Sequence, residues 1–242
     1  MALRTTRTLL TRVTQPSPAR QTAKTKPTTI LEVERKFRRL TVPTLTDICA
    51  TKNNDHYNPN FRSVLPFPTR TIHDIYYDAP DHTLCTSGGA WIRRRNGEWQ
   101  AKVKRGGDFV NSRFEELRGV QEIRDCIRSI LGGGISLKQE GENFGLERLA
   151  EFVTTREAWL VDGEFKVVRD RMDFGHEVGE VELQVEVPVG DAEEEKGVLI
   201  MEEMDRRIEE FMKNYAWAWE CGEAVGKLTA YFEMVRRKNG GV

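Results

Sequence analysis

Residues 32–36 read Glu32-Val33-Glu34-Arg35-Lys36, and the rest of the chain can be organised around this stretch. In a β-strand successive side chains point to opposite faces, so both glutamates and the lysine share one face while Val33 faces the other way. Two carboxylates and an ammonium group in one row can bind a divalent cation and an anionic oxygen side by side. Taken alone, the pentapeptide favours a half-buried strand whose charged face meets water. A binding site is indicated only if other strands place further charged side chains beside this row.

The clearest hairpin covers residues 90–104, where Asn96-Gly97 is a preferred two-residue type I′ turn. A two-residue loop fixes the register of the strands on either side of it. The predicted cross-strand pairs are Arg95 with Glu98, Arg93 with Gln100, and Trp91 with Lys102. One face of this hairpin is therefore cationic and carries Trp91, Arg93, Arg95, Lys102 and Lys104. The other face is mainly apolar, and Arg94 is its exception.

Other predicted strands show the same division into a charged and an apolar face. They cover residues 71–77, 114–117 and 180–187, and residues 152–160 and 164–172 form a second hairpin with Gly163 left-handed in its loop. The acids on the charged faces are Glu32, Glu34, Glu116, Asp170, Glu180 and Glu182, and the cations are Lys36, Arg93, Arg95, Lys102 and Arg156. A solvated sheet face usually contains Ser, Thr and Gln instead of opposed blocks of acids and bases. A sheet that curls with these faces inward would form a tunnel.

The remaining periodic segments predict helices, and hence an α+β fold. Apolar residues recur at helical spacing over residues 123–131, 192–215 and 223–237, and their apolar stripes require a sheet to cover. Residues 44–50 could form a short helix. The Asn- and Pro-rich segment 52–68 is predicted to be a loop or insertion.

Composition excludes several functional classes. The chain has 242 residues, 31% of them charged and 38% hydrophobic, and a net charge of -1, which suits one elaborated domain with no global bias toward nucleic acid. No apolar run approaches the roughly 18 residues of a membrane-spanning helix. The cysteines and histidines show neither zinc-site spacing nor a disulfide framework.

The amino-terminal segment differs from the rest in charge. Residues before Glu32 include no acid but carry six basic side chains, Arg4, Arg7, Arg12, Arg20, Lys24 and Lys26. This pattern fits a mitochondrial transit peptide or a plain disordered basic tail. We therefore expect a disordered segment at 1–29, a single domain at 30–242, and a cytoplasmic or mitochondrial location.

A tunnel with acids on some strands and bases on others suits a metal-bound polyphosphate. Carboxylate oxygens hold Mg²⁺ or Mn²⁺, while guanidinium and ammonium groups neutralise phosphate oxygens. Catalysis in such a site is mainly positioning and charge stabilisation. The chain contains neither a Gly-x-Ser-x-Gly elbow nor a Walker glycine loop, which agrees with this interpretation.

An ordered set of motifs resembles the CYTH superfamily of triphosphate tunnel metalloenzymes, and within it the thiamine triphosphatases. The principal motifs are Glu32-x-Glu34-x-Lys36, Trp91-Ile92-Arg93-Arg94-Arg95, Lys102, Gly179-Glu180-Val181-Glu182 and Lys227-Leu228. Asp74-Ile75-Tyr76-Tyr77-Asp78, Asp173-Phe174-Gly175 and residues 152–159 add to the match. The resemblance runs from Ile30 to about Tyr231.

The resemblance implies an eight-stranded antiparallel β-barrel with a charged interior and helices outside, and Mg²⁺-dependent hydrolysis of the terminal phosphate of thiamine triphosphate. Residues matching metal-binding carboxylates are Glu32, Glu34, Glu180, Glu182 and Glu116. Those matching triphosphate-binding positions are Lys36, Arg93, Arg95, Lys102, Arg156 and Lys227. Tyr76 and Lys102 match residues that assist activation of water. Trp91 matches an aromatic that holds the thiamine moiety, and a structural tryptophan at the tunnel rim is the competing interpretation.

One departure from the family pattern concerns the metal. Val168 stands where the pattern has an acid, two positions before Asp170. Both positions share a face, so Asp170 is the candidate to supply the missing carboxylate.

Three alternatives to a thiamine triphosphatase follow. They are an inorganic triphosphatase of the same superfamily, a non-catalytic polyphosphate-binding module, and a nucleic-acid surface built on the arginine clusters. The acids interleaved on neighbouring strands argue against the last. We expect a monomer that acts on a small-molecule triphosphate, with no nucleic-acid or membrane partner.

Overall fold

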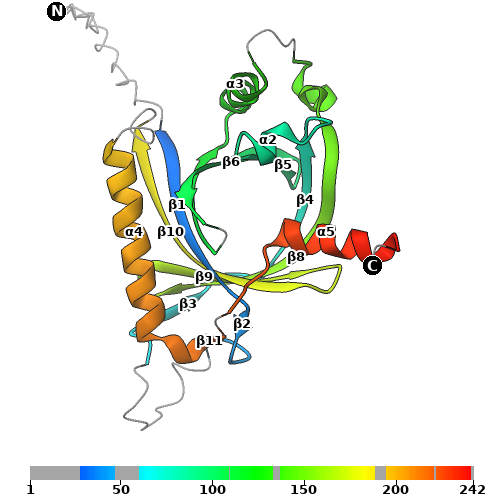
Figure 1. The fold of residues 1–242 in the computed structure, drawn as a ribbon. Coiled ribbons are helices and arrows are strands. Elements are labelled where there is room, and N and C mark those ends of the chain that lie inside the picture. The colour runs from blue at the N-terminus through cyan, green and yellow to red at the C-terminus, as the bar shows by residue number, and fades with distance from the viewer. Residues whose placement is uncertain are drawn as a thin grey trace, which may run out of the picture.

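A computed structural model describes residues 28–46, 60–108, 110–132, 137–188, 195–220 and 222–240. Eight antiparallel strands close into a barrel, which Figure 1 shows from one end. In chain order they are β1 (Thr28–Phe37), β4 (Arg70–Asp78), β5 (Ala90–Arg95), β6 (Glu98–Gly107), β7 (Asn111–Leu117), β8 (Glu147–Val161), β9 (Phe165–Met172) and β10 (Glu177–Pro188). Around the barrel the order is β8-β4-β5-β6-β7-β1-β10-β9, and β9 returns to β8. The predicted α+β barrel is confirmed.

Strand β8 closes the barrel because it is long enough to serve two neighbours. Its first part pairs with β4 from Glu147 to Arg156, and its last part pairs with β9 from Thr154 to Val161. The short strand β3 (Val64–Pro66) adds to the outer edge of β8 at residues 159–161. The prediction of a loop over 52–68 is therefore wrong at β3, and residues 52–59 lie outside the described ranges.

The predicted hairpin registers are confirmed. Asn96 and Gly97 both have positive φ, 50° and 89°, as a type I′ turn requires. The partners across the β5–β6 hairpin are those expected from that turn, including Arg93 with Gln100. In the β8–β9 hairpin, Gly163 has φ 76° and Arg156 lies opposite Asp170.

Helices pack on the outside of the barrel (Figure 1). The helical elements are α2 (Thr83–Thr86), α3 (Val120–Leu131), η1 (Glu140–Gly145), α4 (Glu195–Asn214), η2 (Ala216–Ala218) and α5 (Lys227–Lys238). Strands β2 (Arg39–Leu40) and β11 (Trp219–Glu220) form a separate two-stranded sheet. No helix in these described ranges combines the length and apolar content that crossing a bilayer requires.

Three predicted helices differ from the described structure or lie partly outside it. The helix expected over 223–237 begins only at Lys227, because the preceding segment is held by tertiary contacts: Ala224 is buried and the carbonyl of Val225 lies 2.8 Å from His176 Nε2. The helix expected over 192–215 is described from Glu195, and residues 47–50 of the expected helix at 44–50 lie outside the described part.

Two of the three apolar clusters lie between the barrel wall and these helices. Met201, Ile208 and Phe211 of α4 are buried in one cluster with Leu31 and Val33 of β1. Each such side chain contributes about 1.5–3 kcal/mol when buried. A second cluster lies under α2 and α3, while the third lies on the inner face of the barrel, where Tyr76 and Phe152 pack with residues of α5. Because the two larger clusters occupy the outer face of the strands, much of the inner face is left for charged residues.

One glycine in the barrel is required by close packing. A Cβ added at Gly179 would lie 2.0 Å from Cε2 of Phe37, its partner on the neighbouring strand. The glycine therefore lets the buried Phe37 ring lie flat against β10. This packing fixes the strand immediately before Glu180.

Candidate active site

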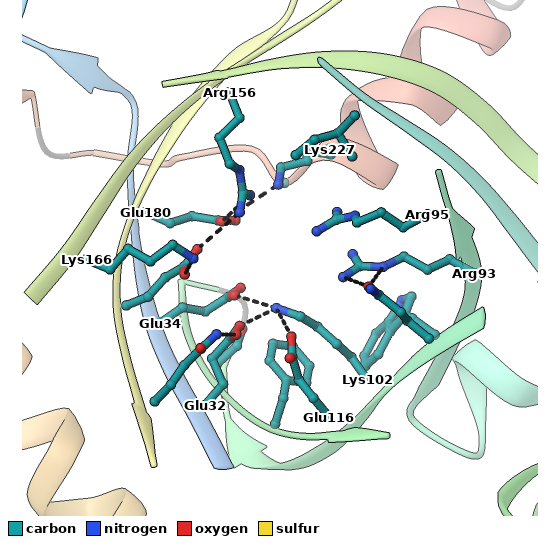
Figure 2. A pocket seen from close by; sticks show the side chains of 18 of the residues that line it. Glu32, Glu34, Arg93, Arg95, Lys102, Glu116, Arg156, Lys166, Glu180 and Lys227 are labelled. Carbon is teal, nitrogen blue, oxygen red and sulfur yellow. Dashed lines mark hydrogen bonds and ion pairs between the residues drawn. The ribbon is translucent and has the colours of Figure 1, made fainter. Parts of the chain in front are cut away.

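The barrel encloses a cavity of about 620 Å³ that is dominated by charged side chains. Among the residues that line it are ten lysines or arginines and six carboxylates, an excess of cations. Figure 2 shows the carboxylates gathered mainly on one side, with Arg93 and Arg95 opposite. This arrangement suits an anion with several negative charges, provided that a cation can also sit against the acids.

The acidic wall comes from β1 and β10. Glu32 and Glu34 are only 2% and 4% exposed, and Glu182 is 3% exposed. Glu34 lies directly opposite Glu182 in the β1–β10 pairing. Like charges in that position destabilise a sheet. The wall therefore requires cations close to it.

Lys102 of β6, a strand separated from β1 only by β7, supplies the central cation beside the acidic wall (Figure 2). Its Nζ forms a close ion pair with Glu32, lies 3.0 Å from Oε2 of Glu34, and lies 3.9 Å from Oε1 of Glu116. The ammonium group also lies 5.0 Å from the centre of the Phe114 ring. Burial opposes the charge, but the three glutamates outweigh it and hold the pKa of Lys102 well above its ordinary value.

The carboxylates around Lys102 differ in their proton affinity. Burial, reinforced by the neighbouring glutamates, raises the pKa of Glu32 to about 8 despite Lys102. Burial also opposes ionisation of Glu34, but Lys102 and Lys36 outweigh it and hold its pKa well below the ordinary range. At Glu116 burial is again outweighed, by Lys102 and Arg93, and the pKa falls to about 2. Of these three carboxylates, Glu32 is thus the one whose ionised form an additional cation would stabilise most.

The opposite wall presents two guanidinium groups from β5. Arg93 donates to Gln100 Oε1 over 3.2 and 3.0 Å and to the hydroxyl of Tyr76 over 3.3 Å. Arg95 forms two hydrogen bonds with Asp74, of 2.8 and 2.7 Å. Both arginines line the cavity.

A third group of charges joins β8, β9, β10 and the start of α5. Arg156 donates to both oxygens of Asp170 over 2.7 and 2.6 Å, and Lys227 also pairs closely with Asp170. Arg156 and Lys227 each lie 3.7 Å from Oε2 of Glu180. Lys166 donates to Oε2 of Glu182 over 2.5 Å.

Aromatic side chains lie on the cavity wall in two places. Trp91 packs edge-on against Phe114, with ring centres 5.6 Å apart and an interplanar angle of 87°. Phe67, which follows β3, is 45% exposed, and its backbone N–H is fixed by a 2.9 Å hydrogen bond to the carbonyl of Ala158.

The structure gathers almost every residue expected in the site around this cavity. Those that line it are Glu32, Glu34, Lys36, Tyr76, Trp91, Arg93, Arg95, Lys102, Glu116, Arg156, Glu180, Glu182 and Lys227. Asp170 is the exception, because it is fully buried behind Arg156 and Lys227. Val168, two positions away on the same strand, is fully buried as well.

Five polar residues that were not expected in the site bond to residues that were. They are Asp74, Gln100, Arg118, Lys166 and Gln184. Strand alternation could have identified two of them as site residues, since Gln184 shares a face with Glu182 and Lys166 shares one with Asp170.

The donor set of the acidic wall fits a hard divalent cation. Its ligand atoms are carboxylate oxygens, which Mg²⁺ and Mn²⁺ prefer. Among the residues that the structure describes, no three acidic, histidine or cysteine side chains converge as a preformed metal site. Instead the ammonium group of Lys102 lies among Glu32, Glu34 and Glu116. The position between these carboxylates is thus one that accepts a cation.

Residues 31–215 match the model of the CYTH domain. The match covers well over half of the chain, so this protein belongs to the CYTH family. The charged barrel described above is the part of the chain that the match spans.

Two curated relatives are thiamine-triphosphatases. The protein from Macaca fascicularis is 31% identical over 130 residues, and that from Homo sapiens is 32% identical over 131 residues. Each alignment covers 48% of this chain and 56% of the relative, so the chain spans about half the length of the curated relatives it matches.

Solved structures with a similar fold are more distant in sequence. A protein from Pyrococcus horikoshii OT3 is 17% identical with a TM-score of 0.47, over 84% of this chain and 98% of that one. A Hippeastrum protein described as having a dominant triphosphatase activity is 16% identical with a TM-score of 0.45, over 87% and 97% of the two chains.

Proposed function

We propose that this protein is a Mg²⁺-dependent hydrolase that removes the terminal phosphate of thiamine triphosphate. The observation that carries the proposal is the closed barrel, with a buried acidic wall facing arginines across one cavity. A triphosphate carries enough negative charge to occupy the cationic side, and a metal ion can occupy the acidic side. Solvent screening is weak in such an enclosed site, so the charges act strongly on a bound phosphate.

The metal would be held by the carboxylates of the acidic wall. The candidates are Glu32, Glu34, Glu180 and Glu182, with Glu116 beside them. When bound, Mg²⁺ or Mn²⁺ supplies positive charge that neutralises phosphate oxygens and polarises the phosphorus–oxygen bond. Asp170 is engaged by Arg156 and Lys227, so in this proposal it orients cations for the phosphates.

The phosphate groups are bound by Lys36, Arg93, Arg95, Arg156 and Lys227. Guanidinium groups match phosphate oxygens with paired hydrogen bonds, while the lysines act as point charges. Because these groups come from different strands and a helix, they surround the chain of phosphates and align its terminal group for attack by water. The reaction breaks a phosphoanhydride bond and requires no covalent intermediate.

Tyr76 and Lys102 are proposed to act on the reacting atoms. The raised pKa of Lys102 keeps its side chain protonated, so it donates hydrogen bonds to developing negative charge and does not serve as a base. The hydroxyl of Tyr76 accepts a hydrogen bond from Arg93, which leaves its own proton free to orient a water or a phosphate oxygen.

The thiamine preference rests on the curated relatives and on the aromatic side chains of the cavity. Both relatives are thiamine-triphosphatases. Trp91 and Phe67 offer apolar rings beside the charged region, where a heterocyclic organic group can pack.

A panel of phosphate-release assays tests the proposal. Purified protein is given thiamine triphosphate, inorganic triphosphate or ATP, each with Mg²⁺, with Mn²⁺ and with a chelator. We expect the highest kcat/KM on thiamine triphosphate and no turnover with the chelator. Comparable rates on all three substrates would refute thiamine specificity, and a clear preference for inorganic triphosphate would make this an inorganic triphosphatase.

A second candidate function is a non-catalytic polyphosphate-binding module. Two observations favour it: Val168 replaces an expected acid, and Lys102 already occupies the space among three carboxylates. This function predicts tight binding of inorganic triphosphate by calorimetry with no phosphate release at any Mg²⁺ or Mn²⁺ concentration.

A further inference from the structure

We propose that Asp74 is a positioning residue that holds Arg95, and with it Arg93, in the orientation that a triphosphate requires. The inference rests on the proposed function of the cavity. Asp74 lies on β4 directly opposite Arg95 of β5, it is fully buried, and it does not line the cavity. Its side chain shares the inner face of β4 with Ile72 and Tyr76, which line the cavity, but it is covered by Arg95 and therefore does not touch the substrate.

The hydrogen bonds between these two side chains determine which guanidinium atoms remain for a ligand. Oδ1 of Asp74 accepts from Nε of Arg95, and Oδ2 accepts from Nη2. A guanidinium has five N–H donors in one plane, so this side-on pairing uses one edge and leaves the other edge to donate elsewhere. Because Arg95 lines the cavity, the free edge is the one available to phosphate oxygens.

Asp74 also lies between two like charges. Arg93 and Arg95 share one face of β5, and Nε of Arg93 is 4.0 Å from Oδ1 of Asp74. Burial opposes ionisation of Asp74, but its hydrogen bonds with Arg95 and the charge of Arg93 lower its pKa, so it is a carboxylate at neutral pH. Its charge offsets the repulsion between the two arginines and lets both face the same ligand.

The same arrangement recurs on another wall of the barrel. Asp170 of β9 is fully buried directly opposite Arg156 of β8, and its two oxygens accept from Nε and Nη2 of that arginine. Two walls thus present a cavity-lining guanidinium backed by a buried cross-strand aspartate. A repeated device of this kind points to presentation of the arginine, in addition to pairing of the strands.

A purely structural salt bridge is the competing explanation, and the chain contains a matched control. Glu115 of β7 is 6% exposed and accepts hydrogen bonds of 3.0 and 2.5 Å from Arg105. This pair does not line the cavity. If Asp74 only stabilises the barrel, then Asp74→Asn and Glu115→Gln should change the same properties.

The test is a double-mutant cycle on Asp74→Asn and Arg95→Ala, with binding of inorganic triphosphate measured by calorimetry and hydrolysis measured by phosphate release. We expect each single variant to raise Kd and KM about tenfold to a hundredfold through misplacement of the guanidinium. The double variant should bind only slightly more weakly than Arg95→Ala alone, because Asp74 acts mainly through Arg95 and only in smaller part through Arg93. Fully additive losses would overturn the proposal, and so would tighter binding by Asp74→Asn, which is the result expected from merely removing a negative charge.

Two further variants keep the test decisive. Glu115→Gln should lower the midpoint temperature of thermal unfolding while leaving Kd and KM unchanged. A rise in KM for Glu115→Gln as large as that for Asp74→Asn would also overturn the proposal. Should Asp74→Asn fail to fold, Arg95→Lys replaces it: an ammonium keeps the charge but cannot make the two-point contact. We expect Arg95→Lys to lose nearly as much affinity as Arg95→Ala, and near-normal affinity would show that charge alone suffices.

The binding measurements separate this inference from the proposed function. If the wild-type protein binds inorganic triphosphate but releases no phosphate, the proposed hydrolase activity fails while the cycle on Kd still tests Asp74. If turnover is normal and the effects on Kd and KM are additive, the positioning role fails and the hydrolase proposal stands.

Discussion

Arg93 and Arg94 are adjacent in the chain, but their guanidinium groups lie on opposite surfaces of the barrel wall. That of Arg93 points into the cavity and donates to the Tyr76 hydroxyl. That of Arg94 lies outside, 5.6 Å from the centre of the Trp99 ring and bonded to the Gly97 carbonyl. The two residues therefore provide a test of which surface carries the chemistry.

We expect Arg93→Ala to raise KM and to lower kcat by about a hundredfold, the usual cost of removing one donor from a charge-stabilising site. Arg94→Ala should change steady-state kinetics little. Phosphate-release kinetics on both variants provide the check, and greater sensitivity at Arg94 would mean that the cavity is not the site.

Glu34→Gln should abolish turnover while the protein still folds. The substitution keeps the shape of the side chain but removes a charge from the acidic wall, where Glu34 faces Glu182. We expect activity to fall by more than about a hundredfold, because even outer-shell changes at metal sites cost about 10- to 100-fold. Activity is measured across a Mg²⁺ titration, and circular dichroism reports folding. Near-normal activity would remove the first strand from the site.

The pKa of Glu32 predicts a pH-dependent stability in metal-free protein. Its pKa is 4.5 ordinarily and about 8 when folded, so the folded state binds this proton more tightly than the unfolded state. The contribution to stability is present in full below about pH 4.5 and is lost as the pH rises through about 8. Urea unfolding between pH 5 and 9 should show the decline, and Glu32→Gln should flatten it. An equally steep decline in that variant would assign it to another group.

The aromatic side chains of the cavity should affect one substrate more than another. Trp91→Ala and Phe67→Ala are expected to raise KM for thiamine triphosphate, because an organic group loses an apolar surface, and to leave KM for inorganic triphosphate unchanged. Leu65→Ala is the matched control for Phe67, since Leu65 is 59% exposed on β3 and does not line the cavity. Equal effects on both substrates would indicate that the rings only support the wall.

Strand alternation and turn chemistry predicted much of the barrel and of the site. The Asn96-Gly97 turn fixed the register of a whole hairpin, and with it the opposite orientations of Arg93 and Arg94. Alternation along residues 180–187 placed Glu180 and Glu182 on the inner face. These inferences succeeded because they depend on local geometry that a few residues determine.

Features that depend on long-range contacts could not be predicted from the sequence. Strand β3 has three residues, too few for a periodic signal, and owes its conformation to pairing with β8. The partnership of Asp74 and Arg95 requires β4 to lie beside β5, and no short turn joins those strands. The start of α5 at Lys227 depends on the contact between His176 and Val225. Apolar spacing alone predicted a helix that begins earlier, at residue 223.

Barrel closure by β8 has a consequence for how the chain folds. The seam between β4 and β8 joins residues far apart in sequence, such as Arg70 with Arg156, and brings like charges into register there. Long-range pairings of this kind form slowly, because loop-closure entropy is lost before the contacts are gained. We expect this seam and the β1–β10 pairing, which joins residues still farther apart such as Thr28 and Pro188, to form late in folding. The opposed rows of acidic and basic side chains would then stay hydrated through most of folding. They would come into contact only when the last strand pairs form and the barrel closes.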